Sequence, residues 1–139
     1  MIQGWHIGVV IPARNEAEHI RAVLEGIPDM VDIAVVVDDG STDRTTEEVG
    51  MSSAACEVIL LEGHGEGVGA SIDRGHQHLL SLFNAPFISV VMAGDGQMNP
   101  LDMDGLIHYL LNKHQTHLLE LLLLYKFLKQ EQQILQYII

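Results

Sequence analysis

The feature that most constrains the fold is a regular alternation of two kinds of segment along the first 111 residues. Four short runs rich in Val, Ile and Leu predict buried strands, at residues 6–11, 33–37, 57–61 and 87–92. Between them lie segments whose apolar residues recur every three or four positions, which predicts amphipathic helices. Strands that alternate with helices predict an α/β fold with a parallel, doubly wound sheet.

The helices carry start signals of their own. Glu18 follows Asn15 by three residues, a capping-box pattern that predicts a helix start at Asn15. A second helix is expected to open near residues 41–43, with acidic residues in its first turns. In the third helix, four apolar residues are expected to share the face that packs on the sheet: Val68, Ile72, Leu79 and Phe83.

Composition narrows the class of protein. The 139 residues are enough for one domain with a sizeable core, and 47% of them are apolar. A formal net charge of −12 makes nucleic acid an unfavourable partner, because an acidic surface repels phosphate backbones. Cys56 is the only cysteine, which excludes an internal disulfide. We see no signal peptide and no membrane-spanning run, and we expect a cytoplasmic protein.

A change of composition divides the chain after residue 111. Residues 1–111 carry four basic and 17 acidic side chains, whereas residues 112–139 carry three and two and are rich in Leu and Gln. We expect residues 1–111 to form the folded domain and residues 112–139 to form an atypical helical tail, either a plain terminal helix or a segment of different origin. A homo-oligomer, if one forms, is expected to form through this apolar tail.

Ligand chemistry is expected where the strands end, because ligands of open α/β sheets bind beyond the carboxyl ends of the strands. That rule selects four segments, residues 12–16, 38–43, 63–69 and 94–100. None of them contains a lysine, and the only basic residues close to them are Arg14 and Arg44. A phosphate pocket of this composition has to neutralise its ligand largely with a metal ion.

Two aspartates stand where the second strand ends. Asp39, with Asp38, is suited to accept hydrogen bonds from a base imide or a ribose hydroxyl, because an ionised carboxylate only accepts. The structural alternative is an Asx turn with helix caps. This alternative explains Asp43 well and a double aspartate poorly.

The end of the fourth strand carries a carboxylate and an amide. Asp95 and Gln97 occupy alternate positions of an extended segment, so both side chains can share one hard cation. The alternative is a Gly-Asp-Gly turn. Separately, Gly65, Gly67 and Ala70 fit a loose dinucleotide-binding pattern at the third strand–helix junction, which leaves a NAD-binding Rossmann domain as another alternative.

Four segments follow one another over residues 7–111: V-V-I-P-A-R-N-E, I-P-D-M-V-D-I-A-V-V-V-D-D-G-S-T-D-R-T, G-E-G-V-G-A-S-I-D-R-G and V-V-M-A-G-D-G-Q-M-N-P. In this order they resemble family 2 glycosyltransferases of the GT-A fold. The G-D-G-Q-M stretch is similar to polyprenyl- and dolichyl-phosphate hexose synthases. The resemblance implies a Rossmann-like GT-A half that binds a nucleotide-diphospho-sugar, for transfer of the sugar to an acceptor such as a polyprenyl phosphate at a membrane surface.

The resemblance also implies roles for single residues. Asp95 is implied as the catalytic and metal-binding residue, holding Mg²⁺ or Mn²⁺ with Gln97 as an additional ligand. Glu16 is implied to lie close to the phosphates. The implied contacts to the nucleotide-sugar are Pro12, Ala13, Asn15, Glu16, Asp38 and Asp39.

The sequence departs from the family's pattern at several points. Ala93 replaces the first Asp of the D-x-D motif, Arg14 replaces a common aromatic, and Asn99 stands where an acidic residue is frequent. Relatives continue into an acceptor-binding half that nothing in residues 112–139 resembles. A truncated, non-catalytic nucleotide-binding or interaction protein is therefore the main alternative. A nucleotidyltransferase of similar fold is a further alternative, but the basic phosphate-binding loop expected near its N-terminus is missing from this sequence.

Overall fold

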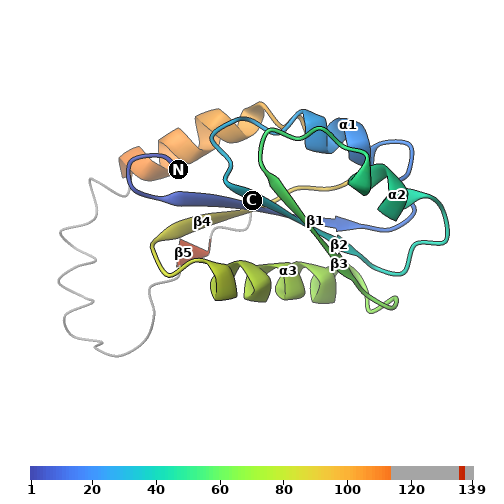
Figure 1. The fold of residues 1–139 in the computed structure, drawn as a ribbon. Helices are drawn as coiled ribbons and strands as arrows, with labels where there is room; N and C mark the ends of the chain where they lie inside the picture. The colour runs from blue at the N-terminus through green and yellow to red at the C-terminus, as the bar shows by residue number, and fades with distance from the viewer. Residues whose placement is uncertain (114–134, 137–139) are drawn as a thin grey trace.

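The fold is built around a parallel β-sheet in the computed structural model, which describes residues 1–113 and 135–136. The strand order is β3-β2-β1-β4-β5, and every neighbouring pair is parallel (Figure 1). The strands are β1 (His6–Ala13), β2 (Ile33–Asp38), β3 (Glu57–Glu62), β4 (Phe87–Val91) and β5 (Leu135–Gln136). The four predicted strands are confirmed, with their carboxyl ends shifted by one or two residues.

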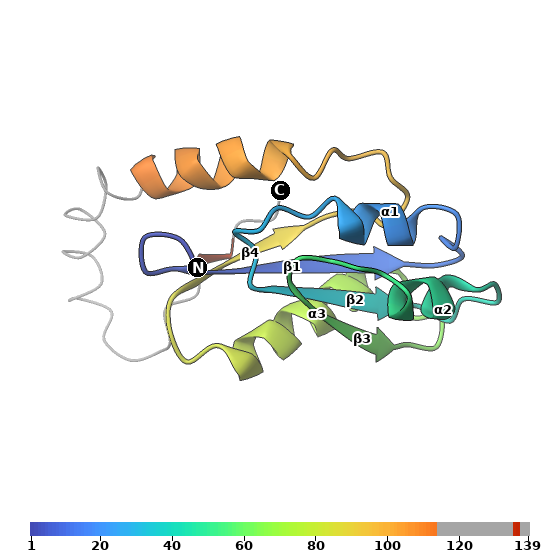
Figure 2. The same ribbon diagram turned by 45° about the horizontal axis from the view of Figure 1, so that its top comes forward.

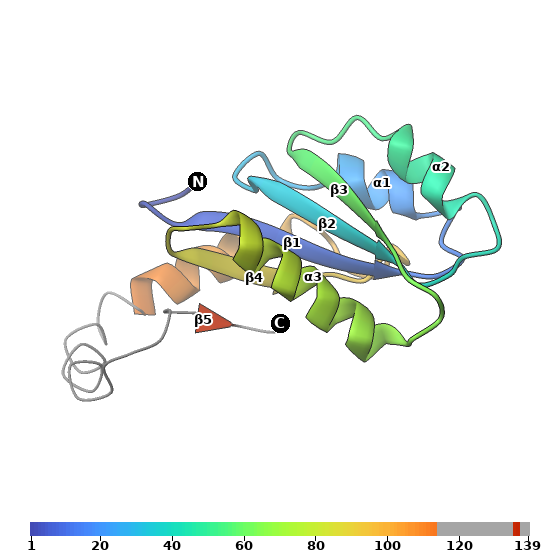
Figure 3. The same ribbon diagram turned by 60° about the horizontal axis from the view of Figure 1, so that its bottom comes forward.

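Helices cover both faces of the sheet. One face carries α1 (Ile20–Glu25), α2 (Thr45–Gly50) and the helix at residues 102–113, and the other carries α3 (Val68–Leu82) (Figure 1, Figure 2 and Figure 3). The predicted α/β fold with a parallel, doubly wound sheet is confirmed. None of the helices in the described part of the chain combines the length and apolar character needed to cross a membrane.

Each face of the sheet has its own apolar core. Side chains of β1 alternate between them, with Val9 facing the α1 side and Val10 the α3 side. The buried cluster on the α3 side consists of Val10, Val35, Val37, Leu79 and Phe87. Because the strands are covered on both faces, they have no polar stripe, which explains their continuous runs of Val and Ile.

Two helices begin later than the sequence predicts. α1 begins at Ile20 rather than at Asn15, and α2 begins at Thr45 rather than within residues 41–43. Neither N-cap residue makes a side-chain capping hydrogen bond. Asn15 and Ser41, polar residues at the expected helix starts, instead form hydrogen bonds between the loops after β1 and β2. The acidic first turn expected for α2 is confirmed, with Glu47 and Glu48.

The buried face of α3 differs in part from the predicted one. Val68 is 66% exposed, whereas Leu79 is fully buried as predicted. The buried residues of the helix are Ser71, Gly75, His76 and Leu79. A Cβ atom on Gly75 would stand 2.3 Å from Cγ1 of Val10. The helix therefore approaches β1 through small residues, which a search for large apolar residues does not detect.

Only part of the predicted helical tail lies within the described residues. Residues 112–113 continue the helix that begins at residue 102. Leu135–Gln136 forms β5, which pairs with Ile88 and Ser89 of β4, so these two residues are a strand and not the predicted helix. The rest of that prediction falls outside the residues that the structure describes.

We expect Gly75→Ala to destabilise the fold by about 1–3 kcal/mol, because the added methyl group forces α3 away from β1. Gly69→Ala, in the first turn of α3, is the matched control, since nothing lies within 4 Å of its Cβ position. The control should leave stability unchanged or raise it by up to about 1 kcal/mol. Urea unfolding measures both, and equal effects would contradict the close contact of α3 with β1.

Candidate functional site

The candidate site lies where three neighbouring strands end together. β1 pairs with β2 on one side and with β4 on the other. Beyond β2, the N–H of Asp39 donates to the carbonyl of Ala13 at 2.9 Å. Beyond β4, the Cβ position of Gly94 lies 3.4 Å from both the Cβ of Ala13 and the carbonyl of Pro12. The loops that carry Asp39 and Asp95 therefore border the same end of β1.

The loop after β1 is held to the loop after β2 by side chains of both. Asn15 has a φ of +55°, and its Oδ1 accepts a hydrogen bond from the N–H of Thr42 at 2.8 Å. The N–H of Asn15 donates to Oγ of Ser41 at 2.8 Å, and that of Glu16 donates to Oγ1 of Thr45 at 2.9 Å. The predicted capping box at Asn15 is wrong, because this side chain is used between loops.

Asp38, the last residue of β2, and Asp43 in the loop after it hold the turn itself. The Asp38 carboxylate accepts hydrogen bonds from the hydroxyl and the N–H of Ser41. Oδ1 of Asp43 accepts from the hydroxyl and the N–H of Thr45, while Oδ2 accepts from the N–H of Ala17 at 3.1 Å. The Thr45 hydroxyl, more than the N–H groups, lowers the pKa of Asp43. The structural explanation of Asp43 as a turn-forming residue is confirmed.

Asp39 is held by three consecutive backbone N–H groups. Its Oδ1 accepts from Gly65 at 3.0 Å and from Glu66 at 2.7 Å, and its Oδ2 accepts from Gly67 at 2.8 Å. The Gly67 hydrogen bond is the main cause that lowers the pKa of Asp39 below its ordinary value of 3.8; Glu66, Gly65 and the charge of Arg14 add to it against the effect of burial. Asp39 therefore orders the loop that follows β3.

This arrangement bears on the dinucleotide-binding alternative. In a Rossmann fingerprint, the glycine-rich loop and the start of its helix present N–H groups to a pyrophosphate. Here the N–H groups of residues 65–67 already donate to a carboxylate of the protein. The loop before α3 is thus arranged around an internal anion.

Two carboxylates at this end of the sheet keep oxygen atoms available. Oδ1 of Asp95 accepts one hydrogen bond, from the N–H of Gln97 at 3.0 Å, and Oδ2 accepts none from the described residues. The Glu16 carboxylate likewise forms no hydrogen bond or ion pair within the described part of the chain. Both loops adjoin His19, whose N–H donates to the Glu16 carbonyl at 3.0 Å and whose Cβ is 3.6 Å from the Cβ position of Gly96.

A metal ion at this end would have few protein ligands. No group of three or more His, Cys, Asp or Glu side chains is arranged for a metal within residues 1–113 and 135–136. Asp95 offers a free carboxylate oxygen, and the exposed Gln97 follows two residues later. This set fits Mg²⁺ or Mn²⁺ bound mainly by substrate phosphates and water, because Mg²⁺ commonly uses one or two protein carboxylates.

Several residues of this site were not predicted from the sequence. Ser41 and Thr45 connect the loops after β1 and β2, and His19 lies between the loops after β1 and β4. Serine is a common turn residue, but its partner here, the N–H of Asn15, can be predicted only once β1 and β2 are known to be neighbours. For His19 the sequence carries no signal at all.

One family model matches most of this chain, and two curated proteins are similar to it. The model described as Glycosyl transferase family 2 matches residues 8–116. The uncharacterized protein MJ0544 of Methanocaldococcus jannaschii is 36% identical over 101 residues, which cover 70% of this chain and 44% of that protein. The uncharacterized protein MJ1222 of the same organism is 33% identical over 103 residues, which cover 73% of this chain and 40% of that protein. This chain thus spans less than half the length of these relatives. No solved structure gave a significant match.

The lowered pKa of Asp39 predicts a specific loss of stability in acid. The ionised carboxylate stabilises the folded state above the ordinary pKa of 3.8, and this contribution disappears as the pH falls from there through the lower folded-state pKa. Asp39→Asn should therefore be less stable than the parent near pH 6, and the difference should shrink toward about pH 3.

Thermal unfolding across this pH range measures the effect. Asp29→Asn is the matched control, because Asp29 is exposed and accepts no hydrogen bond from a described residue. The control should keep the parent's profile. A constant difference between Asp39→Asn and the parent at every pH would contradict the assigned role of the three N–H groups.

Proposed function

This chain belongs to glycosyl transferase family 2, and on that premise we propose that it forms the donor-binding part of a glycosyltransferase. The donor is a nucleotide-diphospho-sugar, bound with Mg²⁺ or Mn²⁺. The observation that carries the proposal is the pair of free carboxylates, Glu16 and Asp95, on two loops that border the same end of β1. With no cation partner among the described residues, both carboxylates are available to a divalent ion or to its water shell.

Asp95 is the proposed catalytic and metal-binding residue. Its Oδ2 is available, and the Asx turn with the Gln97 N–H fixes the orientation of the carboxylate through Oδ1. We propose the Gln97 side chain as an additional ligand. A divalent ion held here supplies charge neutralisation for the leaving diphosphate. Glu16 is proposed to lie beside the phosphates and to orient their water or metal shell.

The nucleoside is proposed to lie over the loops after β1 and β2. Pro12 and Ala13 are the last residues of β1 with backbone at the site, and Asn15 fixes the loop above them. Asp39 retains capacity for one further hydrogen bond, because each carboxylate oxygen accepts about two and Oδ2 accepts one here. We propose that Asp39, with Asp38, contacts the base or the ribose through such remaining capacity.

The acceptor is proposed from the resemblance of the G-D-G-Q-M stretch, which is similar to polyprenyl-phosphate hexose synthases. A polyprenyl phosphate is already ionised, so its attack on the sugar needs no general base. Location at a membrane periphery and assembly through residues 112–139 belong to the same proposal. The relatives are more than twice as long as the matched segment, so an acceptor site is expected in the part they have in addition.

The alternative to be tested is a non-catalytic nucleotide-binding or interaction protein. A NAD-binding domain is the other alternative, and the engagement of the loop at residues 65–67 with Asp39 argues against it. Transfer of a radiolabelled sugar to a polyprenyl phosphate would show a catalytic protein, and no transfer by the folded protein would favour the non-catalytic alternative. NADH fluorescence on titration tests the dinucleotide reading.

We expect UDP or GDP to bind in the presence of Mn²⁺ and to lose at least tenfold in affinity in excess chelator, because the site offers carboxylates and no lysine to the phosphates. Asp95→Asn should weaken metal-dependent binding by about tenfold or more, since it removes a charged ligand. Isothermal titration calorimetry measures both effects.

Asp102→Asn is the matched control, an exposed aspartate seven residues further along the chain, and it should bind as the parent does. Equal binding of the nucleotide with metal and with excess chelator would refute the proposed site. So would unchanged metal-dependent binding in folded Asp95→Asn protein.

A further inference from the structure

The strand β3 has a free edge. It is the outermost strand on its side of the sheet among the described residues. The N–H of Glu57 donates to a carbonyl just before β2 at 3.3 Å, and the N–H of Gly63 donates to the carbonyl of the last residue of β2 at 2.6 Å. Because the direction of these groups alternates along a strand, the N–H and C=O groups of Val58 and Leu60 point away from the sheet.

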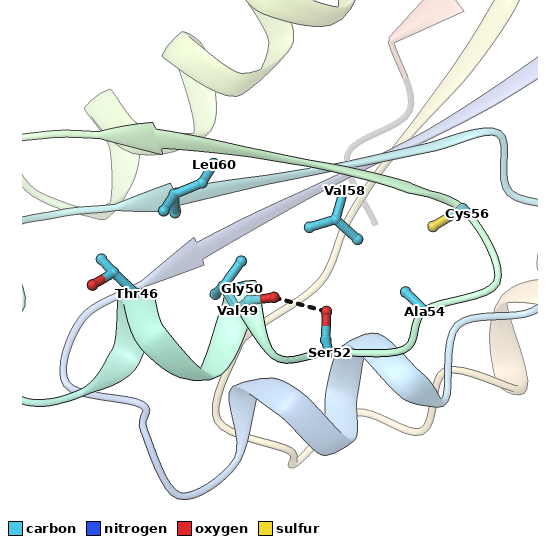
Figure 4. A pocket seen from close by; sticks show the side chains of 8 residues that line it. All are labelled: Thr46, Val49, Gly50, Ser52, Ala54, Cys56, Val58 and Leu60. Carbon is cyan, nitrogen blue, oxygen red and sulfur yellow. Dashed lines mark hydrogen bonds between the residues drawn. The ribbon is translucent and has the colours of Figure 1, made fainter.

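A hollow opens beside this edge. It has a volume of about 310 Å³ and lies between β3 and α2 with the loop that follows α2 (Figure 4). Val58 and Leu60 point into it from β3, opposite Val49 of α2 and Ala54 of the loop. The hydroxyl of Ser52 donates to the carbonyl of Val49 at 2.8 Å, so this polar group is satisfied within the protein. Val49, Ala54, Cys56, Val58 and Leu60 give the hollow apolar walls, and Thr46, Ser52 and backbone groups give it a polar share at least as large.

The two ends of the strand are acidic. Glu57 and Glu62 are exposed, and neither carboxylate forms an ion pair within the described residues. Arg74 donates a hydrogen bond to the backbone carbonyl of Glu62 and forms no ion pair with its carboxylate. A second copy paired along β3 would add its own two glutamates to an edge that already carries two, so the edge disfavours a second copy and favours a basic partner.

We propose that the edge of β3 and its hollow form a docking surface for an extended segment of a partner protein, apolar at alternate positions and basic at both ends. The backbone of that segment pairs with Val58 and Leu60 and adds a strand to the sheet. Its apolar side chains on one face enter the hollow, and its basic residues pair with Glu57 and Glu62. The surface lies on an outer strand and involves none of the proposed donor-binding residues.

The test uses two capped hexapeptides, Lys-Thr-Val-Thr-Val-Lys and the same peptide with glutamate at both ends, so that the terminal side chains lie on opposite faces of the added strand, as those of Glu57 and Glu62 do. Isotope-labelled full-length chain is titrated with each and followed by NMR. The lysine peptide should shift the amide signals of Val58, Leu60 and Val49, slow the hydrogen exchange of the first two, and bind at least fivefold more tightly than the glutamate peptide. Its affinity should fall at high salt.

Equal binding of both peptides, no binding, or shifts confined to other residues would overturn the proposal. Protection of the same amides by concentration-dependent self-association, without peptide, would also overturn it, because the edge would then belong to a second copy. The readout involves no nucleotide, so it is independent of the donor site.

Two variants test the backbone and the charge separately. Val58→Pro removes an outward N–H and leaves the β2 ladder intact, a position at which edge strands tolerate proline. It should weaken binding of the lysine peptide at least fivefold with the circular dichroism spectrum retained. Glu57→Lys combined with Glu62→Lys changes only exposed side chains and should reverse the peptide preference. A retained preference for the lysine peptide in this folded variant would contradict the proposal.

Discussion

Parallel pairing of β1 on both of its edges is the constraint on which the candidate site depends. β1 is in register with β2 up to Ala13 and with β4 up to Val10, so the loops after all three strands converge. The hydrogen bond from Asp39 to Ala13 and the packing of Gly94 on the same residue follow from this register. A slip of one residue would exchange the side chains that face the two cores, and the different packing of these cores holds the register.

Carboxylates at this end of the sheet have two kinds of task. Asp38, Asp39 and Asp43 accept hydrogen bonds from the protein's own N–H and hydroxyl groups, and so give fixed shapes to the loops after β1, β2 and β3. Glu16 and Asp95 keep oxygen atoms available. The hydrogen bonds stabilise the ionised form of the first group, which shapes the loops, whereas the second group has oxygen atoms free to bind a cation.

The sequence was sufficient for the strands, the parallel sheet and the loops that follow the strands, because apolar periodicity is a local signal. It was insufficient for the starts of α1 and α2, since the side chain of Asn15 has its partner in another loop, and that partner depends on strand order. The buried face of α3 was predicted only in part, because close approach at Gly75 replaces large apolar contacts. The sequence did not distinguish Asp39, whose carboxylate accepts three backbone N–H groups, from Asp95, whose Oδ2 is available; the hydrogen bonds of the structure do.

The central proposal is that Asp95, with Gln97 as an additional ligand, holds a divalent ion on the diphosphate of the donor, and that Glu16 lies beside the phosphates. Paramagnetic broadening by Mn²⁺ in the presence of UDP or GDP, measured by NMR on the labelled chain, tests it most directly. We predict the strongest broadening at the amide signals of residues 94–97 and 13–16, weakening toward the amino-terminal ends of the strands. Broadening centred elsewhere, or identical spectra with and without nucleotide, would contradict it.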